Sequence, residues 1–138
     1  LPFFAVQGDM LQLPFRDNQF DKTVSITALE FIEDARTAVN ELFRITRPGG
    51  IIVVATLNSL SPWAVRRSQK GEDHLLENAC YRSPDDLLSL AVLEGETETV
   101  VHFMNNDDPD KAVQIEREGK SRKLGTGAFA AVRWQKPS

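Results

Sequence analysis

The sequence predicts an α/β fold with a mostly parallel sheet, an antiparallel closing strand and helices on the faces of the sheet. Strand and helix patterns alternate along most of the chain, which is typical of parallel strands joined by crossover helices. The segment Ile51 to Ala55 is apolar at every position, so it suits a strand in the middle of a covered sheet. The last two strand patterns, residues 97–103 and 127–134, form a closing pair that can be antiparallel.

The N-terminal half contains two further strand patterns and one helix. The short apolar run Phe3 to Val6 indicates a buried strand, and the β-branched segment Thr23 to Ile26 indicates a second. Asp34 is placed to cap a helix whose apolar residues fall on one face: Ala35, Ala38, Val39, Leu42 and Ile45. Pro48, Gly49 and Gly50 are expected to end that helix and turn the chain into the central strand.

The C-terminal half gives weaker patterns. A short helix is expected around Trp63 to Arg67, within a polar stretch. Ser83, Pro84 and Asp86 form the start signal of another helix, with a capping box. That helix is expected to close at Gly95 and to present an apolar face made of Leu87, Leu88, Ala91 and Val92. Residues 97–103 read as a strand, and residues 104–123 as a loop with a short helix.

Length and composition restrict the class of protein. A chain of 138 residues suits one domain, and a net charge of -4 gives no basic footprint for nucleic acid. No apolar run reaches the ~18–20 residues that a membrane span needs. Cys80 is the only cysteine, so no internal disulfide can form and a cytoplasmic location is expected. His74 and His102 are isolated in the sequence, and we expect no metal site.

An ordered set of short motifs gives the most specific signal. It consists of Gly8-Asp9-Met10-Leu11-Gln12-Leu13-Pro14-Phe15, Phe20-Asp21, Glu41-x-x-Arg44 and Pro48-Gly49-Gly50. With the strand and helix spacing around it, this set resembles the class I S-adenosylmethionine-dependent methyltransferases, in particular their small-molecule type 11-like group. The resemblance is close over residues 6–58 and holds only in outline beyond them.

The resemblance implies a Rossmann-like methyltransferase fold and S-adenosyl-L-methionine as the cofactor. The family's glycine-rich turn after its first strand has no counterpart in residues 1–138, since Gly49 and Gly50 follow a helix instead of a strand. We therefore expect these residues to form a single domain equivalent to the C-terminal two-thirds of a class I methyltransferase domain. We also expect this chain alone to be incomplete for cofactor binding.

The resemblance assigns cofactor-binding roles to five residues. Asp9 would accept a hydrogen bond from the adenine amino group, beside the backbone of Met10 and Leu11. Thr27 and Leu29 lie in the loop that lines the methionine end of the cofactor in the family. From the residues alone, Asp9 can equally be a turn-stabilising aspartate after a glycine.

Four residues are candidates for the acceptor side: Glu30, Phe31, Asn58 and Trp63. Glu30 is also a weak candidate for a general base, which would require reach and a raised pKa. The alternative for Glu30 is a solvated loop carboxylate, and the alternative for Trp63 is packing beneath a loop. Arg66 and Arg67 fit a solvated helix face better than an anion site, although an acidic substrate is compatible with them.

The expected function is methyl transfer from S-adenosylmethionine to a small-molecule acceptor. The alternative is a non-catalytic remnant that acts as an oligomerisation or interaction module; a nicotinamide-dependent oxidoreductase fits less well, because it lacks the Pro-Gly-Gly agreement. The segment Thr23 to Ile26 is expected to have an unpaired edge, and such edges recruit another strand. We therefore expect a homodimer, with no nucleic-acid or membrane partner.

Overall fold

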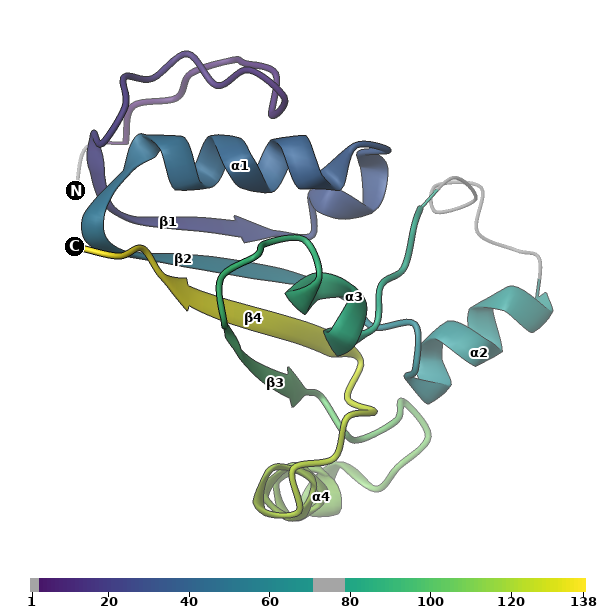
Figure 1. The fold of residues 1–138 in the computed structure, drawn as a ribbon. Helices are drawn as coiled ribbons and strands as arrows, with labels where there is room; N and C mark the ends of the chain where they lie inside the picture. Colours follow the sequence, from purple (N-terminus) through teal and green to yellow (C-terminus); the bar gives the residue numbers. More distant parts are fainter. Residues whose placement is uncertain (1–2, 71–78) are drawn as a thin grey trace.

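The computed structural model describes residues 3–70 and 79–138. A four-stranded sheet in the order β1-β2-β4-β3 organises the chain (Figure 1). Its strands are β1 (Phe20–Ile26), β2 (Thr46–Leu57), β3 (Glu96–Val100) and β4 (Phe129–Gln135). The strand β1 is parallel to β2, whereas β4 is antiparallel to both β2 and β3. The α/β fold with an antiparallel closing strand is confirmed: β1, β2 and β3 run in one direction and β4 in the other, so the sheet has one parallel and two antiparallel strand pairs.

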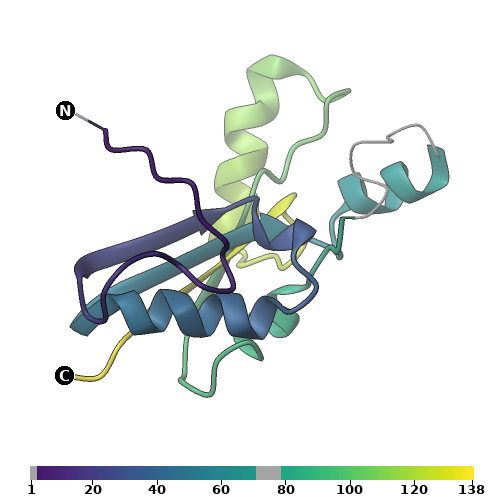
Figure 2. The ribbon, with the colours of Figure 1, turned by 90° about the horizontal axis from the view of Figure 1, so that it is seen from above.

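The helices of the described residues are η1 (Leu29–Phe31), α1 (Ala35–Ile45), α2 (Pro62–Lys70), α3 (Pro84–Leu88) and α4 (Pro109–Ser121). Figures 1 and 2 show α1 and α3 on one face of the sheet, with α4 beyond the β3 side and α2 past the end to which β1 and β2 point. None of the described helices is long and apolar enough to cross a membrane.

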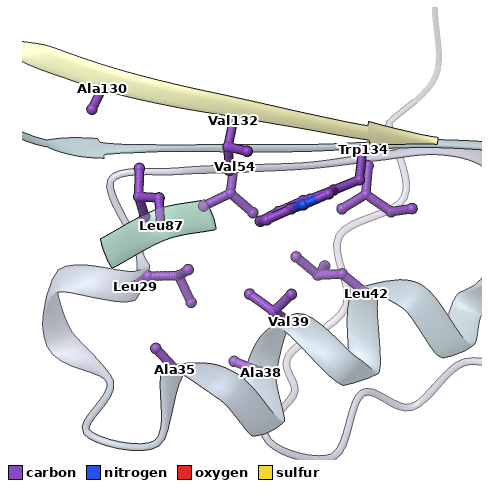
Figure 3. Close-up of a cluster of buried hydrophobic side chains, with 11 residues drawn as sticks. Leu29, Ala35, Ala38, Val39, Leu42, Val54, Leu87, Ala130, Val132 and Trp134 are labelled. Carbon is purple, nitrogen blue, oxygen red and sulfur yellow. The ribbon is translucent and has the colours of Figure 1, made fainter. Parts of the chain in front are cut away.

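The helix α1 forms as its sequence indicates. Asp34 accepts a hydrogen bond from the Thr37 amide at 3.0 Å, which satisfies one of the free donors of the first turn. The apolar face of α1 packs on β2 and β4 around Trp134, which is fully buried and tilts against the Phe43 ring at 5.7 Å between centroids (Figure 3). The side chains of this core are Leu29, Ala35, Ala38, Val39, Leu42, Ile52, Val54, Leu87, Ala130, Val132 and Trp134.

Three boundaries differ from the expectation. The helix α1 ends at Ile45, and Pro48 to Gly50 lie within β2, where the register with β1 shifts and Gly49 has a φ of 75°. The helix α3 keeps its predicted capping box but ends at Leu88, which leaves Val92 fully exposed. Gly95 does not close a helix; a Cβ there would lie 2.6 Å from the Trp134 ring nitrogen, so this position needs glycine for close packing.

The predicted strand at Phe3 to Val6 is wrong. This segment has no strand structure, and the Phe3 and Phe4 side chains are 94% and 91% exposed. An apolar run becomes a strand only where a neighbouring strand satisfies its backbone, and no strand of the described chain lies beside this segment. The other expected strands are present with shifted ends, and the loose segment 104–123 contains the thirteen-residue helix α4.

Candidate functional site

All four strands have one end at the same side of the sheet, which we call the carboxyl edge. The carboxyl ends of β1, β2 and β3 meet the amino end of β4 there, because β4 alone runs in the opposite direction. Backbone hydrogen bonds continue past the strands: the Asn58 amide donates to the Ala128 carbonyl and the Ala128 amide to the Val101 carbonyl, both at 2.9 Å. Ligands of open α/β sheets bind at this carboxyl edge.

The backbone at this edge is strained at two positions. Thr27 follows β1 with a φ of 49°, and Val101 follows β3 with a φ of 64°. Both side chains are β-branched, and such residues rarely adopt positive φ. Strain of this kind concentrates at binding and catalytic sites, where the surrounding structure holds it in place. The Thr27 amide is fixed by donation to the Ala55 carbonyl at 2.9 Å.

Glu30 lies under this edge, and the expectation of a solvated carboxylate is wrong. Its side chain is 1% exposed, and Oε1 accepts a hydrogen bond from the Leu57 amide at 2.7 Å. Oε2 is buried without a partner in the described part of the chain. The hydrogen bond to Leu57 joins residues that are 27 apart in sequence, and it ties the loop after β1 to the end of β2.

A buried arginine that the sequence did not suggest supports the same loop. Arg82 is 8% exposed and donates to the backbone carbonyls of Leu29 and Ile32, at 2.7 and 3.2 Å. Leu29 itself is fully buried in the core, so its side chain cannot line a cofactor site as expected. Phe31 is exposed at the end of η1.

Asn58 has a different position from the one expected for an acceptor contact. Its side chain is fully buried, and Nδ2 donates to the carbonyls of Gly125 and Gly127 at 2.9 and 2.8 Å. Its Oδ1 accepts from the Leu60 amide at 3.0 Å. The nitrogen and the oxygen of the amide group both bond within the protein, so Asn58 builds the floor of the edge.

A pocket opens on this edge between the end of β2, α2 and the start of β4. Its volume is about 200 Å³. We call it the α2 pocket, and its lining residues are Leu57, Asn58, Ser61, Trp63, Ala64, Arg67, Tyr81, Val101, Ala128 and Phe129. Trp63 lines this pocket, and its Nε1 anchors the segment after β3 by donating to the Phe103 carbonyl at 3.1 Å.

A second hollow runs along the free edge of β1. This β1 groove is lined by Met10, Leu13, Phe15, Phe20, Lys22, Thr23, Val24, Ser25, Ile26, Ala28, Leu42 and Ile45. Met10 and Ala28 both line it beside Ile26, so the groove brings the Asp9–Leu11 motif to the loop that follows β1.

Asp9 forms the turn that its position after a glycine indicates. Its Oδ1 accepts from the Leu11 amide at 2.8 Å, and its carbonyl accepts from the Gln12 amide at 3.1 Å. The Leu11 amide is therefore already used. The carboxylate is exposed, so its second oxygen is open to a ligand.

Arg44 holds the rest of this motif on α1. Its guanidinium donates to Glu41, to Asp17 and to the carbonyls of Leu13 and Phe15, while Glu41 accepts from the Leu13 amide at 2.8 Å. The Arg44 hydrogen bond is the largest factor that holds the pKa of the Glu41 carboxyl below its usual value. The Glu41-x-x-Arg44 motif thus forms an ion pair on α1 that also fixes the Leu-Pro-Phe segment.

His102 lies in the loop after β3, and its ring packs against Gly119 of α4. His74 falls outside the described residues. Within residues 3–70 and 79–138, no three His, Cys, Asp or Glu side chains are grouped so that they could hold a metal ion.

Comparison with known proteins agrees with this geometry. Residues 2–54 match the methyltransferase domain family. The demethylmenaquinone methyltransferase of Streptomyces avermitilis is 40% identical over 68 residues, which are 49% of this chain and 28% of that protein. The malonyl-[acyl-carrier protein] O-methyltransferase of Buchnera aphidicola is 39% identical over 54 residues, which are 39% of this chain and 22% of that protein. The chain therefore matches about a quarter of the length of these curated relatives.

Solved structures extend the similarity of fold to nearly the whole chain. A methyltransferase of Thermotoga maritima, described as a possible histamine N-methyltransferase, superposes with a TM-score of 0.78 at 21% identity, over 96% of this chain and 64% of that one. A phosphoethanolamine N-methyltransferase of Haemonchus contortus, solved with S-adenosylhomocysteine, gives a TM-score of 0.58 at 15% identity, over 94% of this chain and 36% of that one. These likenesses show that the chain has the fold of S-adenosylmethionine-dependent methyltransferases, and residues 2–54 carry the sequence match to the methyltransferase domain family.

Proposed function

We propose that the protein transfers a methyl group from S-adenosylmethionine to a small-molecule acceptor at the carboxyl edge of the sheet. The observation that carries this proposal is the convergence at one edge of the strained loop after β1, the Asp9–Leu11 motif beside it and the α2 pocket. The curated relatives matched by this chain are named as methyltransferases of small or carrier-bound compounds. No observation on the described residues favours the alternative of a non-catalytic interaction module.

The residues present fit the nucleoside end of the cofactor. The free oxygen of Asp9 is an acceptor for an adenine amino group, and Met10 follows it with a backbone amide. When bound, the cofactor supplies an electrophilic methyl group on a sulfonium. The chain's own task is to align the acceptor with that group and to exclude water, so a strong acid–base apparatus is not required.

Glu30 has a positioning role in this proposal. Its carboxylate is directed at the Leu57 amide and does not line the α2 pocket, so it is poorly placed to take a proton from an acceptor there. Instead it holds the loop after β1 against the end of β2. Thr27 at the head of that loop stays a candidate for contact with the methionine end of the cofactor, and exposed Phe31 a candidate for contact with the acceptor.

The test is binding of S-adenosylhomocysteine to the chain and to any longer protein that contains it, by calorimetric titration. Where binding is measured, Asp9→Ala should weaken it by about 1–3 kcal/mol, the usual cost of a lost hydrogen-bond partner. Asp110→Ala, in an exposed carboxylate at the start of α4, is the matched control and should not change affinity. Equal affinities for the Asp9 variant and the unmodified protein would leave Asp9 with its turn role alone.

We also propose that the free edge of β1 pairs with a second copy of the chain. The strand lies at the edge of the sheet, and Val24 and Ile26 are 58% and 62% exposed. Lys22 is a charge of the kind that discourages edge pairing, but neither lysine nor proline occurs between Thr23 and Ile26. Two-fold pairing is the commonest closed arrangement of identical subunits.

A further inference from the structure

The α2 pocket has strongly apolar walls. Its lining includes the Trp63 and Phe129 rings, together with Leu57, Ala64, Val101 and Ala128. At about 200 Å³ it is smaller than the ~300–1,000 Å³ of sites that take drug-sized ligands. A single aromatic ring with one substituent is the type of molecule that matches both the size and the surface.

Most polar atoms in the lining are already used inside the protein. The Asn58 amide is committed at both ends, as described above. Ser61 Oγ donates to the Asn58 carbonyl at 2.8 Å and accepts from the Ala64 amide at 3.1 Å. Trp63 Nε1 is bound to the Phe103 carbonyl. The donors of these groups are all engaged, so none of them can donate to a ligand without the loss of an existing hydrogen bond.

Two polar groups of the lining are different. The Arg67 guanidinium and the Tyr81 hydroxyl line the pocket, and neither has a hydrogen bond or ion pair to any residue that the structure describes. The neighbouring Arg66 does, because its guanidinium donates to Asn105 Oδ1 at 2.8 Å and it does not line the pocket. Of the two adjacent arginines, only Arg67 therefore offers an unmatched positive charge at the pocket.

The carboxylates bonded to backbone around the pocket are also committed. Glu30 accepts from the Leu57 amide, and Glu116 accepts from the amides of Val101 and His102 at 3.1 and 2.7 Å. Burial opposes the charge of Glu116, but those two amide hydrogen bonds keep the pKa of its carboxyl below the usual value. Neither carboxylate forms an ion pair with Arg67, so within the described residues its exposed guanidinium is free to bind an anion.

We propose that the α2 pocket binds a small aromatic carboxylate, with the ring between Trp63 and Phe129 and the carboxylate on Arg67. A guanidinium matches a carboxylate with two parallel hydrogen bonds, and aromatic rings contribute large contact area in a defined geometry. This inference rests on the proposed function for its claim that the bound compound is the methyl acceptor. A neutral quinone ring would fill the same walls but leave the Arg67 charge unmatched.

The test uses benzoate and its neutral isostere benzamide as probes, titrated into the 138-residue chain and followed by backbone amide shifts in NMR spectra. Benzoate should bind at least about ten times more tightly than benzamide, with shifts at Val101, Ala128 and Phe129. Arg67→Gln should remove that preference, whereas Arg66→Gln, the matched control, should keep it. Ala64→Leu should fill the pocket and weaken both probes.

Several results would overturn the inference: no binding of either probe, equal binding of both, equal effects of the two arginine variants, or shifts away from the pocket. The measurement needs neither cofactor nor methyl transfer. Methyl transfer is assayed separately, in a longer protein that contains this chain and binds the cofactor. Benzoate binding without any transfer there would refute the proposed function and leave the pocket's ligand class standing. Transfer in a protein whose α2 pocket does not bind benzoate would refute the ligand class and leave the proposed function standing.

Discussion

Asn58→Ala tests whether the floor of the candidate site is held by one buried side chain. The change removes three hydrogen bonds: two that Nδ2 donates to the carbonyls of Gly125 and Gly127, and one that Oδ1 accepts from the Leu60 amide. Gly127 is buried, so its carbonyl loses a partner that water cannot easily replace. The Gly125 carbonyl belongs to an exposed residue and can be hydrated.

The expected loss of stability follows from the difference in burial between the two glycine carbonyls. Each stranded buried group costs about 1–3 kcal/mol, and an exposed one costs little, so we expect unfolding free energy to fall by about 2–4 kcal/mol. Urea unfolding at neutral pH measures this as a lower midpoint with an unchanged slope. Amide exchange at Ala128 should also accelerate, because the loop before β4 loses its anchor.

Two companion variants sharpen the test. Asn58→Asp keeps the size and the Oδ1 acceptor but replaces the donating group with an oxygen that faces two carbonyls, so it should destabilise at least as much as alanine. Asn40→Ala, on the exposed side of α1, should change stability by no more than about 0.5 kcal/mol. If Asn58→Ala and Asn40→Ala have the same urea midpoint and the same slope, Asn58 does not hold the floor of the site.

Three further outcomes are expected. Glu30→Gln keeps an acceptor for the Leu57 amide and should retain both stability and any methyl transfer, whereas Glu30→Ala should lose stability. If Glu30→Gln folds normally but abolishes methyl transfer in a protein that has this activity, Glu30 is a base and not a positioning residue. The pKa values of the Asp86 and Glu41 carboxyls lie below their ordinary values of 3.8 and 4.5, chiefly because of hydrogen bonds from the Ser83 amide and from Arg44, respectively. The stability that these two carboxylates contribute is therefore present above the ordinary pKa values. It is lost as the pH falls through the lower pKa values of the folded state. Urea midpoints from about pH 6 to about pH 2 measure that loss, which should be smaller in Asp86→Asn. Ile26→Lys places a charge on the exposed part of β1 and should shift the assembly towards monomer in sedimentation across a concentration series, while an unmodified chain that is monomeric throughout contradicts the edge-pairing proposal.

The elements with local signals could be predicted from the sequence. The helix α1 has its cap three residues before the amide it binds and a regular apolar face, and α3 has a complete capping box within four residues. The central position of β2 follows from its apolar composition alone. Such signals need no knowledge of distant residues, which is why the starts of both helices and the central strand are predicted correctly although the helix ends are not.

The residues that build the site depend on contacts far apart in sequence, and they were placed less well. Asn58 meets Gly127, 69 residues later, and Glu30 meets Leu57, 27 residues later. Nothing near either residue in the sequence indicates those partners. The same reason explains why the sequence does not indicate the buried Arg82 and does not distinguish Arg67 from Arg66, since a guanidinium looks the same in sequence whether it is buried, paired or open to a ligand.

The buried polar groups at the carboxyl edge have one property in common that bears on the chemistry. Glu30, Asn58 and Arg82 all direct their side chains at backbone amides or carbonyls of the loops that follow β1 and β2 or precede β4. Buried polar networks fix geometry, because each member is costly to leave without its partners. A reaction whose reactive group arrives with the cofactor depends mainly on alignment and exclusion of water. Glu30, Asn58 and Arg82 hold loops at the carboxyl edge, which is the kind of support that the proposed methyl transfer would need, and Arg67 is the cationic residue of the pocket lining on which the proposal of a small anionic acceptor depends.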